Sequence, residues 1–130
     1  STELVGGLRS HDRKAIASVS LTTDSSLLTA WTNDSDFETV FSRQVEALGE
    51  AGDVLVALST SGNSKNVIEA IKCADIMDIY TIVLTGKSGG LLKNSGTVTI
   101  RIPSDDTQRI QEGHITVGHI LCELVENSIR

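Results

Sequence analysis

Hydrophobic and polar positions along the chain follow two patterns, one typical of strands and one typical of helices. Residues 53–58 and 79–84 are almost continuously apolar, whereas residues 37–48 and 63–78 place apolar side chains three and four positions apart. A continuous apolar run is typical of a strand covered on both faces in a parallel sheet, and the three-to-four spacing is typical of a helix packed on such a sheet. The pattern therefore predicts strands that alternate with helices.

Weaker signals extend this alternation over the whole chain. Residues 15–22 and 97–102 are rich enough in small and β-branched side chains to predict two more strands, and the only proline, Pro103, ends the second of them. Helices are predicted over residues 25–32 and 106–130, with a short one at 91–93, and the first five residues resemble the interior of a helix. Strands that alternate with helices predict an α/β fold, a three-layer parallel sheet with helices on both faces.

Composition limits the classes of function that remain. The chain has 130 residues, a formal net charge of −6 and only 3 % aromatic residues, so we expect one domain without a broad nucleic-acid-binding surface. No apolar run approaches the roughly 20 residues of a membrane-spanning helix. Cys73 and Cys122 have no C-x-x-C spacing, which predicts reduced packing residues and a cytoplasmic location.

A hydroxyl-rich loop stands between the predicted strand at 53–58 and the helix that follows. This serine loop reads Ser59-Thr60-Ser61-Gly62-Asn63-Ser64. Free N–H groups at a helix N-terminus favour an anion, and hydroxyls donate to phosphate oxygens, so the loop has the form of a monophosphate site. A polar turn that only caps the helix is the alternative. Nucleotide-binding glycine motifs are absent from the sequence, and the later Gly-rich loop at 85–90 reads as a flexible turn.

Three stretches together resemble a known family. They are Leu58–Ser64, Leu84–Gly90, and Arg109-Ile110-Gln111-Glu112 with His119 further along. The chain is similar over nearly all its length to the sugar isomerase (SIS) domain family and, within it, to the phosphoheptose isomerases. The resemblance implies a flavodoxin-type SIS fold in a single domain over residues 1–130. It also implies that an N-terminal helix, a first strand, an Asn-Gly-Gly-Ser loop and a metal-binding histidine are missing from these residues.

The resemblance further implies an activity and its residues. Family members convert sedoheptulose 7-phosphate into D-glycero-D-manno-heptose 7-phosphate through an enediol, the first step of ADP- or GDP-heptose biosynthesis. By this resemblance Glu3 and His119 form the acid/base pair, and Glu3, Gln111 and His119 hold a divalent ion, expected to be zinc. The implied substrate contacts are Asn33, Asp34, Ser59, Thr60, Ser61, Ser64 and Gln111.

Without the resemblance these residues have plainer interpretations. Glu3 reads as a solvated helix residue, Gln111 as a surface amide, and His119 as a core or interface histidine. Gln111 and His119 are eight residues apart, about 12 Å along a helix axis, so either long side chains converge or a neighbouring subunit completes the site. His114 lies at a stripe position of the last helix and is expected to pack.

Two further expectations concern partners. A second apolar stripe on the last helix, through Ile115, Ile120 and Val125, predicts self-association, and the resemblance implies a homotetramer. The alternative function is a non-catalytic SIS protein that binds the bacterial replication initiator. Such relatives commonly interrupt the serine loop with an arginine and lack the histidine at the last helix, whereas Ser61 and His119 are both kept here. The isomerase is therefore favoured, with a sugar phosphate as its small-molecule partner.

Overall fold

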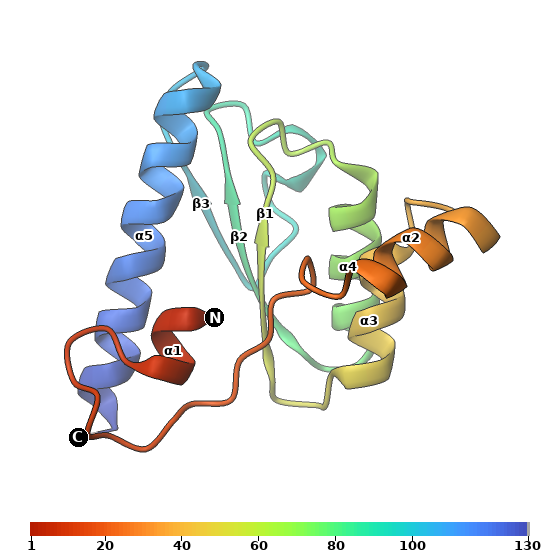
Figure 1. Ribbon diagram of the computed structural model, residues 1–130. Coiled ribbons are helices and arrows are strands. Elements are labelled where there is room, and N and C mark those ends of the chain that lie inside the picture. Colours follow the sequence, from red (N-terminus) through yellow and green to blue (C-terminus); the bar gives the residue numbers. More distant parts are fainter. Residues whose placement is uncertain (130) are drawn as a thin grey trace.

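A parallel sheet forms the middle layer of the computed structural model, which describes residues 1–129 (Figure 1). Strands β1 (Val54–Leu58), β2 (Tyr80–Thr85) and β3 (Val98–Arg101) lie in the order β1-β2-β3. Val56 pairs with Ile82 and Val83 with Thr99, both in parallel ladders. The predicted α/β fold is confirmed, and these three strands begin within one residue of the predicted positions.

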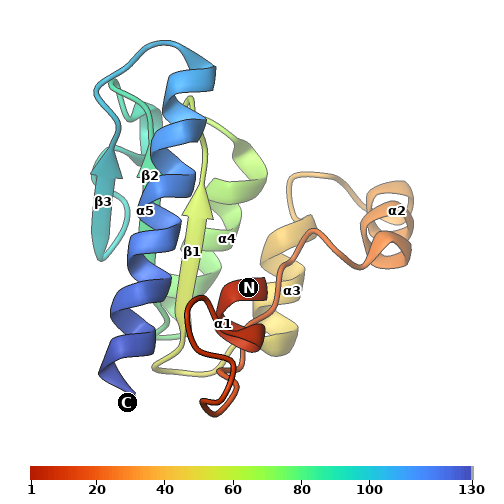
Figure 2. The same cartoon turned by 60° about the vertical axis from the view of Figure 1, so that its left-hand side comes forward.

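Helices cover both faces of this sheet. Helices α3 (Val40–Leu48) and α4 (Lys65–Ile76) lie on one side, and α5 (Thr107–Ser128) lies on the other with the short α1 (Thr2–Gly6) against it (Figures 1 and 2). Helix α2 (Ser25–Asp34) extends beyond α3, and the 3₁₀ turn η1 (Gly90–Leu92) follows β2. The last residue of the predicted helix 106–130, Arg130, lies outside the described residues.

Local chemistry explains where the longer helices begin. The carboxylate of Asp106 accepts the N–H of Gln108 at 2.9 Å at the start of α5, and Asp24 accepts the N–H of Leu27 at 3.0 Å at the start of α2. Such side-chain caps satisfy N–H groups that have no partner inside the helix. These two aspartates therefore set the starts of α2 and α5.

The main core fills the layer between the sheet and helices α3 and α4. Its buried apolar side chains come from the strands, the two helices and the segments beside them: Val45, Ala57, Ala70, Ile71, Ala74, Ile79, Val83 and Leu92. On the opposite side, Ile110 and His114 of α5 are buried. His114 Nε2 lies 3.1 Å from the carbonyl oxygen of Thr85, so the prediction that His114 packs is confirmed.

The predicted strand at residues 15–22 is wrong for the described structure. Residues 14–20 have no strand pairing, and Ile16 instead donates its N–H to the carbonyl of Leu4 at 3.2 Å. A strand exists only through its hydrogen-bonded neighbour, and this segment has none within residues 1–129. Its end is held by the side-chain amide of Gln44, which donates to the carbonyl of Leu21 at 3.0 Å.

The expectation that residues 53–58 are covered on both faces is also wrong for the described residues. Val54, Val56 and Leu58 are 56 %, 46 % and 51 % exposed, whereas Ala57, which points to the other face, is buried. The cause is the placement of α5, which packs over β2 rather than β1. One face of β1 is therefore open although its sequence is uniformly apolar.

Both cysteines are unpaired and half-buried, as predicted for packing residues. The Sγ of Cys73 lies 3.8 Å from the Sδ of Met77, and burial raises the pKa of the Cys73 thiol. Within residues 1–129, no helix is both long enough and apolar enough to cross a bilayer.

Candidate active site

The serine loop is braced by its own hydroxyls where β1 ends. Ser59 is buried, and its Oγ lies 2.8 Å from Ser64 Oγ and accepts the N–H of Gly62 at 3.1 Å. Ser61 Oγ accepts the N–H of Asn63 at 3.1 Å. These bonds fix the path of the loop before any ligand arrives.

Helix α4 begins at this loop without a side-chain cap. Ser64 occupies the N-cap position, but its hydroxyl contacts Ser59 and not the helix N–H groups. In the described part of the chain, the N–H groups of Lys65 and Asn66 meet no hydrogen-bond acceptor. The open donors and the positive end of a 12-residue helix favour an anion at this point. The geometry therefore favours anion binding over simple capping.

The Gly-rich loop after β2 contacts the serine loop directly, so it does more than turn the chain. Gly62 has φ +68°, and a Cβ there would overlap the carbonyl oxygen of Gly89. Leu92 donates its N–H to the Gly62 carbonyl at 3.1 Å, and Leu91 donates to Asn63 Oδ1 at 3.0 Å. Glycines that face each other let the two backbones touch.

A hollow of about 220 Å³ opens beside the serine loop at the carboxyl edge of the sheet. It is lined by the serine loop, the Gly-rich loop and the start of α5, through Thr60, Ser61, Lys87, Ser88, Ser104, Asp105, Thr107 and Ile110. Only Thr60 and Ser61 of these were predicted as site residues. The Nζ of Lys87 lies 3.3 Å from Asp105 Oδ2, so the hollow combines several hydroxyls with one ammonium group.

Glu3 and His119 lie on two helices that pack together. Glu3 is half-buried on α1, which rests on α5, and His119 is exposed on α5. His119 is seven residues before Glu126, so both lie on the same face of α5, and Glu126 binds the segment just after α1. Gln111 is exposed near the start of α5.

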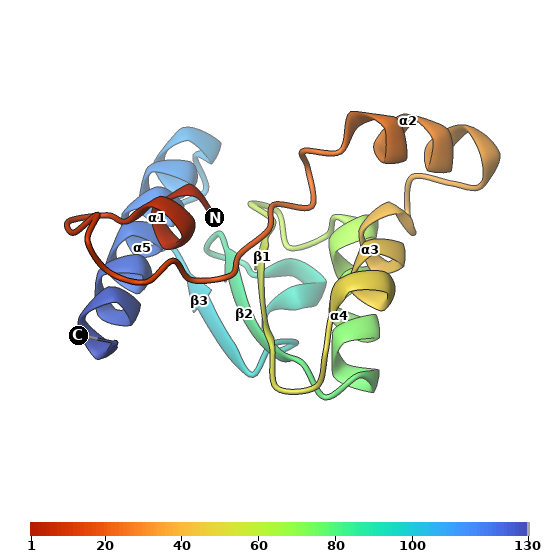
Figure 3. The same ribbon diagram turned by 60° about the horizontal axis from the view of Figure 1, so that its bottom comes forward.

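Asn33 and Asp34 lie far from this pair in a single chain. They are exposed at the end of α2, where Asn33 Nδ2 donates to Asp34 Oδ1 at 2.8 Å. Helix α2 stands on the opposite side of the sheet from α5 (Figure 3). The structure therefore brings together the serine loop residues, and separately the helices of Glu3 and His119, but it leaves the two α2 residues apart from both.

The expected zinc ligands Glu3, Gln111 and His119 come from α1 and α5. No group of three histidine, cysteine, aspartate or glutamate side chains comes together anywhere in residues 1–129. Gln111 and His119 are eight residues apart on α5, and Glu3 is the only carboxylate of the expected ligand set. Glu3 and His119 are the two members of the expected set that belong to these residue types, and the resemblance implies a further histidine as a ligand.

A buried ion pair lies next to α1. Arg13 Nε lies 2.9 Å from Glu126 Oε2, and the Glu126 carboxylate also accepts backbone N–H groups of residues 8–10. The hydrogen bond from Arg13, followed by those from the backbone, lowers the pKa of Glu126 to about 2. Nothing in the local sequence pattern marks this pair, because Glu126 lies on the side of α5 away from the apolar stripe of Ile110 and His114.

This lowered pKa predicts a specific loss of stability in acid. A carboxyl with a depressed folded-state pKa stabilises the fold above its unfolded pKa, and that contribution disappears as pH falls toward the folded value. We expect the difference in unfolding free energy between the unaltered chain and Glu126→Gln to shrink steadily between about pH 4.5 and pH 2. Denaturant unfolding at a series of pH values measures it, and a difference that stays constant over this window contradicts the assignment.

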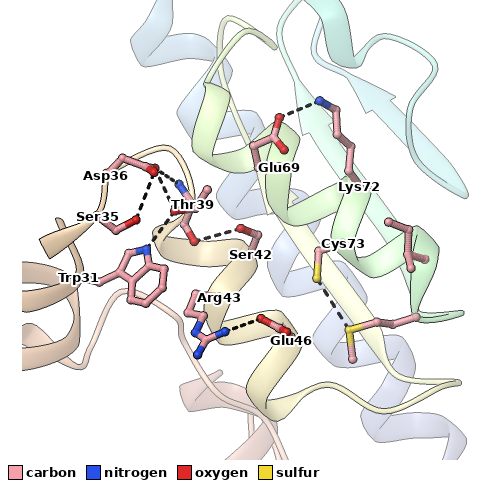
Figure 4. A pocket seen from close by; sticks show the side chains of 12 residues that line it. Trp31, Ser35, Asp36, Thr39, Ser42, Arg43, Glu46, Glu69, Lys72 and Cys73 are labelled. Carbon is pink, nitrogen blue, oxygen red and sulfur yellow. Dashed lines mark hydrogen bonds and ion pairs between the residues drawn. The ribbon is translucent and has the colours of Figure 1, made fainter.

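A second hollow, of about 780 Å³, lies elsewhere, between α2, α3 and α4 (Figure 4). Its polar groups are satisfied among themselves: Trp31 Nε1 donates to Thr39 Oγ1 at 2.9 Å, and the Arg43 guanidinium stacks 5.1 Å from the Trp31 ring centroid. Hydrogen bonds from Thr39 lower the pKa of Asp36 there. None of the predicted site residues lines this hollow.

Comparison with known proteins decides the family. A model of the SIS domain matches residues 2–86. Curated phosphoheptose isomerases from Akkermansia muciniphila and Aquifex aeolicus are each 50 % identical over 129 residues, 99 % of this chain and 68 % and 67 % of the relatives. The chain belongs to the phosphoheptose isomerase family.

Solved structures of phosphoheptose isomerases have the same fold. The protein from Francisella tularensis superposes with a TM-score of 0.91 at 34 % identity, over 97 % of this chain and 68 % of that one. The protein from Neisseria gonorrhoeae gives a TM-score of 0.85 at 48 % identity, over 97 % of this chain and 66 % of that one. The chain thus spans about two thirds of the length of these phosphoheptose isomerases.

Proposed function

We propose that this chain is part of an isomerase that converts sedoheptulose 7-phosphate into D-glycero-D-manno-heptose 7-phosphate. The single observation that carries the proposal is the braced serine loop at the open N-terminus of α4, in a chain that is 50 % identical to curated phosphoheptose isomerases. The loop holds the terminal phosphate, which leaves the other end of the sugar for proton transfer.

The reaction moves one proton between adjacent carbons. Glu3 removes the proton from C1 of the ketose while His119 donates a proton to the carbonyl oxygen on C2, and the C1–C2 enediol forms. Glu3 then returns its proton to C2, and His119 takes the proton from the C1 hydroxyl, which leaves the aldehyde at C1. Every proton removed is returned, so the carboxylate and imidazole end in their starting states.

The serine loop is expected to set affinity more than chemical rate. Ser61 is exposed at the hollow and its Oγ accepts only from the backbone of Asn63 among the described residues, so its O–H is available to a phosphate oxygen. Loss of a hydrogen bond to a charged group costs about 1.5–3 kcal/mol. We expect Ser61→Ala to raise KM about 10- to 100-fold with kcat nearly unchanged.

Steady-state kinetics measure this split. Ser26→Ala on α2 is a matched control, because it removes an exposed serine hydroxyl on the other side of the sheet, and its KM should stay within about twofold. A normal KM in Ser61→Ala contradicts the assignment of the serine loop to the phosphate.

Four finer points belong to the same proposal. Zinc is proposed as the divalent ion, with Glu3, Gln111 and His119 as ligands completed from outside the described residues. A homotetramer is proposed because Ile115, Ile120 and Leu124 leave apolar side chains exposed along α5. Unpaired cysteines support the cytoplasm, and the product would enter ADP- or GDP-heptose synthesis for lipopolysaccharide.

The decisive experiment is an isomerase assay on the chain together with any sequence that its gene encodes on either side. Sedoheptulose 7-phosphate is incubated in D₂O, and NMR follows the aldose. We expect the aldose to carry deuterium at C2, because the transferred proton exchanges with solvent while it resides on Glu3. Binding of the ketose without any conversion would overturn the proposal in favour of a non-catalytic SIS protein.

A further inference from the structure

One buried ion pair ties the end of α5 to the segment that follows α1. Arg13 and Glu126 are 113 positions apart in sequence, and their side chains are only 7 % and 2 % exposed. Each of the other ion pairs among the described residues joins side chains that are more than a third exposed, such as Arg9 and Glu123 at 66 % and 35 %. The burial of both side chains therefore distinguishes this ion pair from the others among the described residues.

The arginine of this pair also holds α1. Arg13 Nη2 donates to the carbonyl oxygens of Glu3 at 2.8 Å and Leu4 at 2.9 Å. Helix α1 has only five residues, too few to be stable without outside contacts. The position of Glu3 thus depends on the guanidinium of Arg13.

The carboxylate of Glu126 binds the backbone of residues 8–10, directly after α1. Glu126 Oε2 accepts the N–H of Leu8 at 2.9 Å, and Oε1 accepts those of Arg9 at 3.2 Å and Ser10 at 3.0 Å. Glu126 lies two helical turns after His119, about 10.5 Å along the axis and on the same face of α5. One helix therefore carries His119 and the anchor of the segment that carries Glu3.

We propose that Arg13 and Glu126 are positioning residues, which hold the carboxylate of Glu3 on the His119 face of α5. The proposal rests on the proposed function, which assigns proton transfer to Glu3 and His119. Neither positioning residue is part of the serine loop, so their loss should impair chemistry and spare phosphate binding. A misplacement of about 1 Å lowers the rate of an oriented reaction about 100-fold.

The kinetic test compares three variants. Glu126→Gln keeps the size of the side chain but presents an amide NH₂ to groups that are all donors, and Arg13→Lys keeps the charge but loses the planar group that reaches both α1 and Glu126. We expect kcat to fall about 100-fold in each, with KM within threefold. Glu123→Gln, which breaks the exposed pair with Arg9 on the same helix, should keep both constants within about twofold.

Amide hydrogen exchange provides a readout that needs no activity. In Glu126→Gln and in Arg13→Lys, amide exchange should become faster at residues 2–10 and stay unchanged at residues 65–76 of α4. If the unaltered protein does not isomerise the sugar, the proposed function fails while this exchange result still tests the anchoring of α1. Should Glu126→Gln fail to fold, Arg13→Lys decides. An unchanged kcat, a loss confined to KM, or unchanged exchange at residues 2–10 would overturn the proposal.

Discussion

Replacement of His119 by asparagine should lower kcat for sedoheptulose 7-phosphate by about 10²- to 10⁴-fold, the usual effect of losing a positioned general acid or base. His119 is exposed on α5 beside α1, so it can reach a ligand, and its substitution leaves the core intact. Asparagine keeps polar contacts but cannot exchange a proton near neutral pH. KM should change little, because the proposed site of the phosphate is the serine loop and not α5.

Steady-state kinetics with NMR detection of the aldose measure this effect. Thr116→Ala is a suitable control, since Thr116 is exposed on the same helix and its hydroxyl contacts only the carbonyl of Glu112 at 2.9 Å in the described structure. Its kcat should stay within about twofold of the unaltered enzyme. A rise in KM at constant kcat in His119→Asn would make His119 a binding residue and remove it from proton transfer.

Replacement of Gly62 by alanine should both destabilise the protein and weaken sugar-phosphate binding. The left-handed backbone at φ +68° costs about 1–2 kcal/mol for a residue with a Cβ. The new methyl group would also overlap the carbonyl group of Gly89. We therefore expect the serine loop to shift and KM to rise about tenfold or more, as when one hydrogen bond to a charged group is lost.

Gly52→Ala separates the effect of backbone strain from the effect of the overlap with Gly89. Gly52 has φ +91°, so alanine there carries a similar backbone strain, but a Cβ at this position meets nothing within 4 Å. We expect Gly52→Ala to lose stability without a change in KM. Denaturant unfolding and kinetics on both variants make the comparison, and equal behaviour of the two would show that the contact between the loops does not shape the site.

Hydrophobic patterns within short stretches of sequence correctly predicted the helices and strands that those patterns define. The apolar runs of β1 and β2 and the spacing of α3 and α4 lie within short windows, so their periods are legible in the sequence. Residues 15–22 have strand-like composition, yet strand formation requires a neighbour that residues 1–129 do not provide. The open face of β1 was unpredictable for a similar reason, because it depends on where α5 crosses the sheet.

In the candidate site, too, features formed by neighbouring residues were predictable and contacts between distant segments were not. The serine loop was predictable because six adjacent residues carry its hydroxyls, its turn and its helix start. The contact of Gly62 with Gly89 and the bond of Arg13 to Glu126 were not, since each joins segments whose distance in the fold has no trace in local composition. Asn33 and Asp34 stay a prediction from family resemblance alone.

The open side of β1 has a practical consequence for anyone who handles this stretch of chain alone. Within the described residues, β1 hydrogen-bonds only to β2, so its other edge presents unpaired backbone groups beside the exposed Val54, Val56 and Leu58. Such an edge is a template on which extended segments of other molecules can add. Concentrated samples should therefore tend to aggregate, and light scattering that increases with time would detect this first.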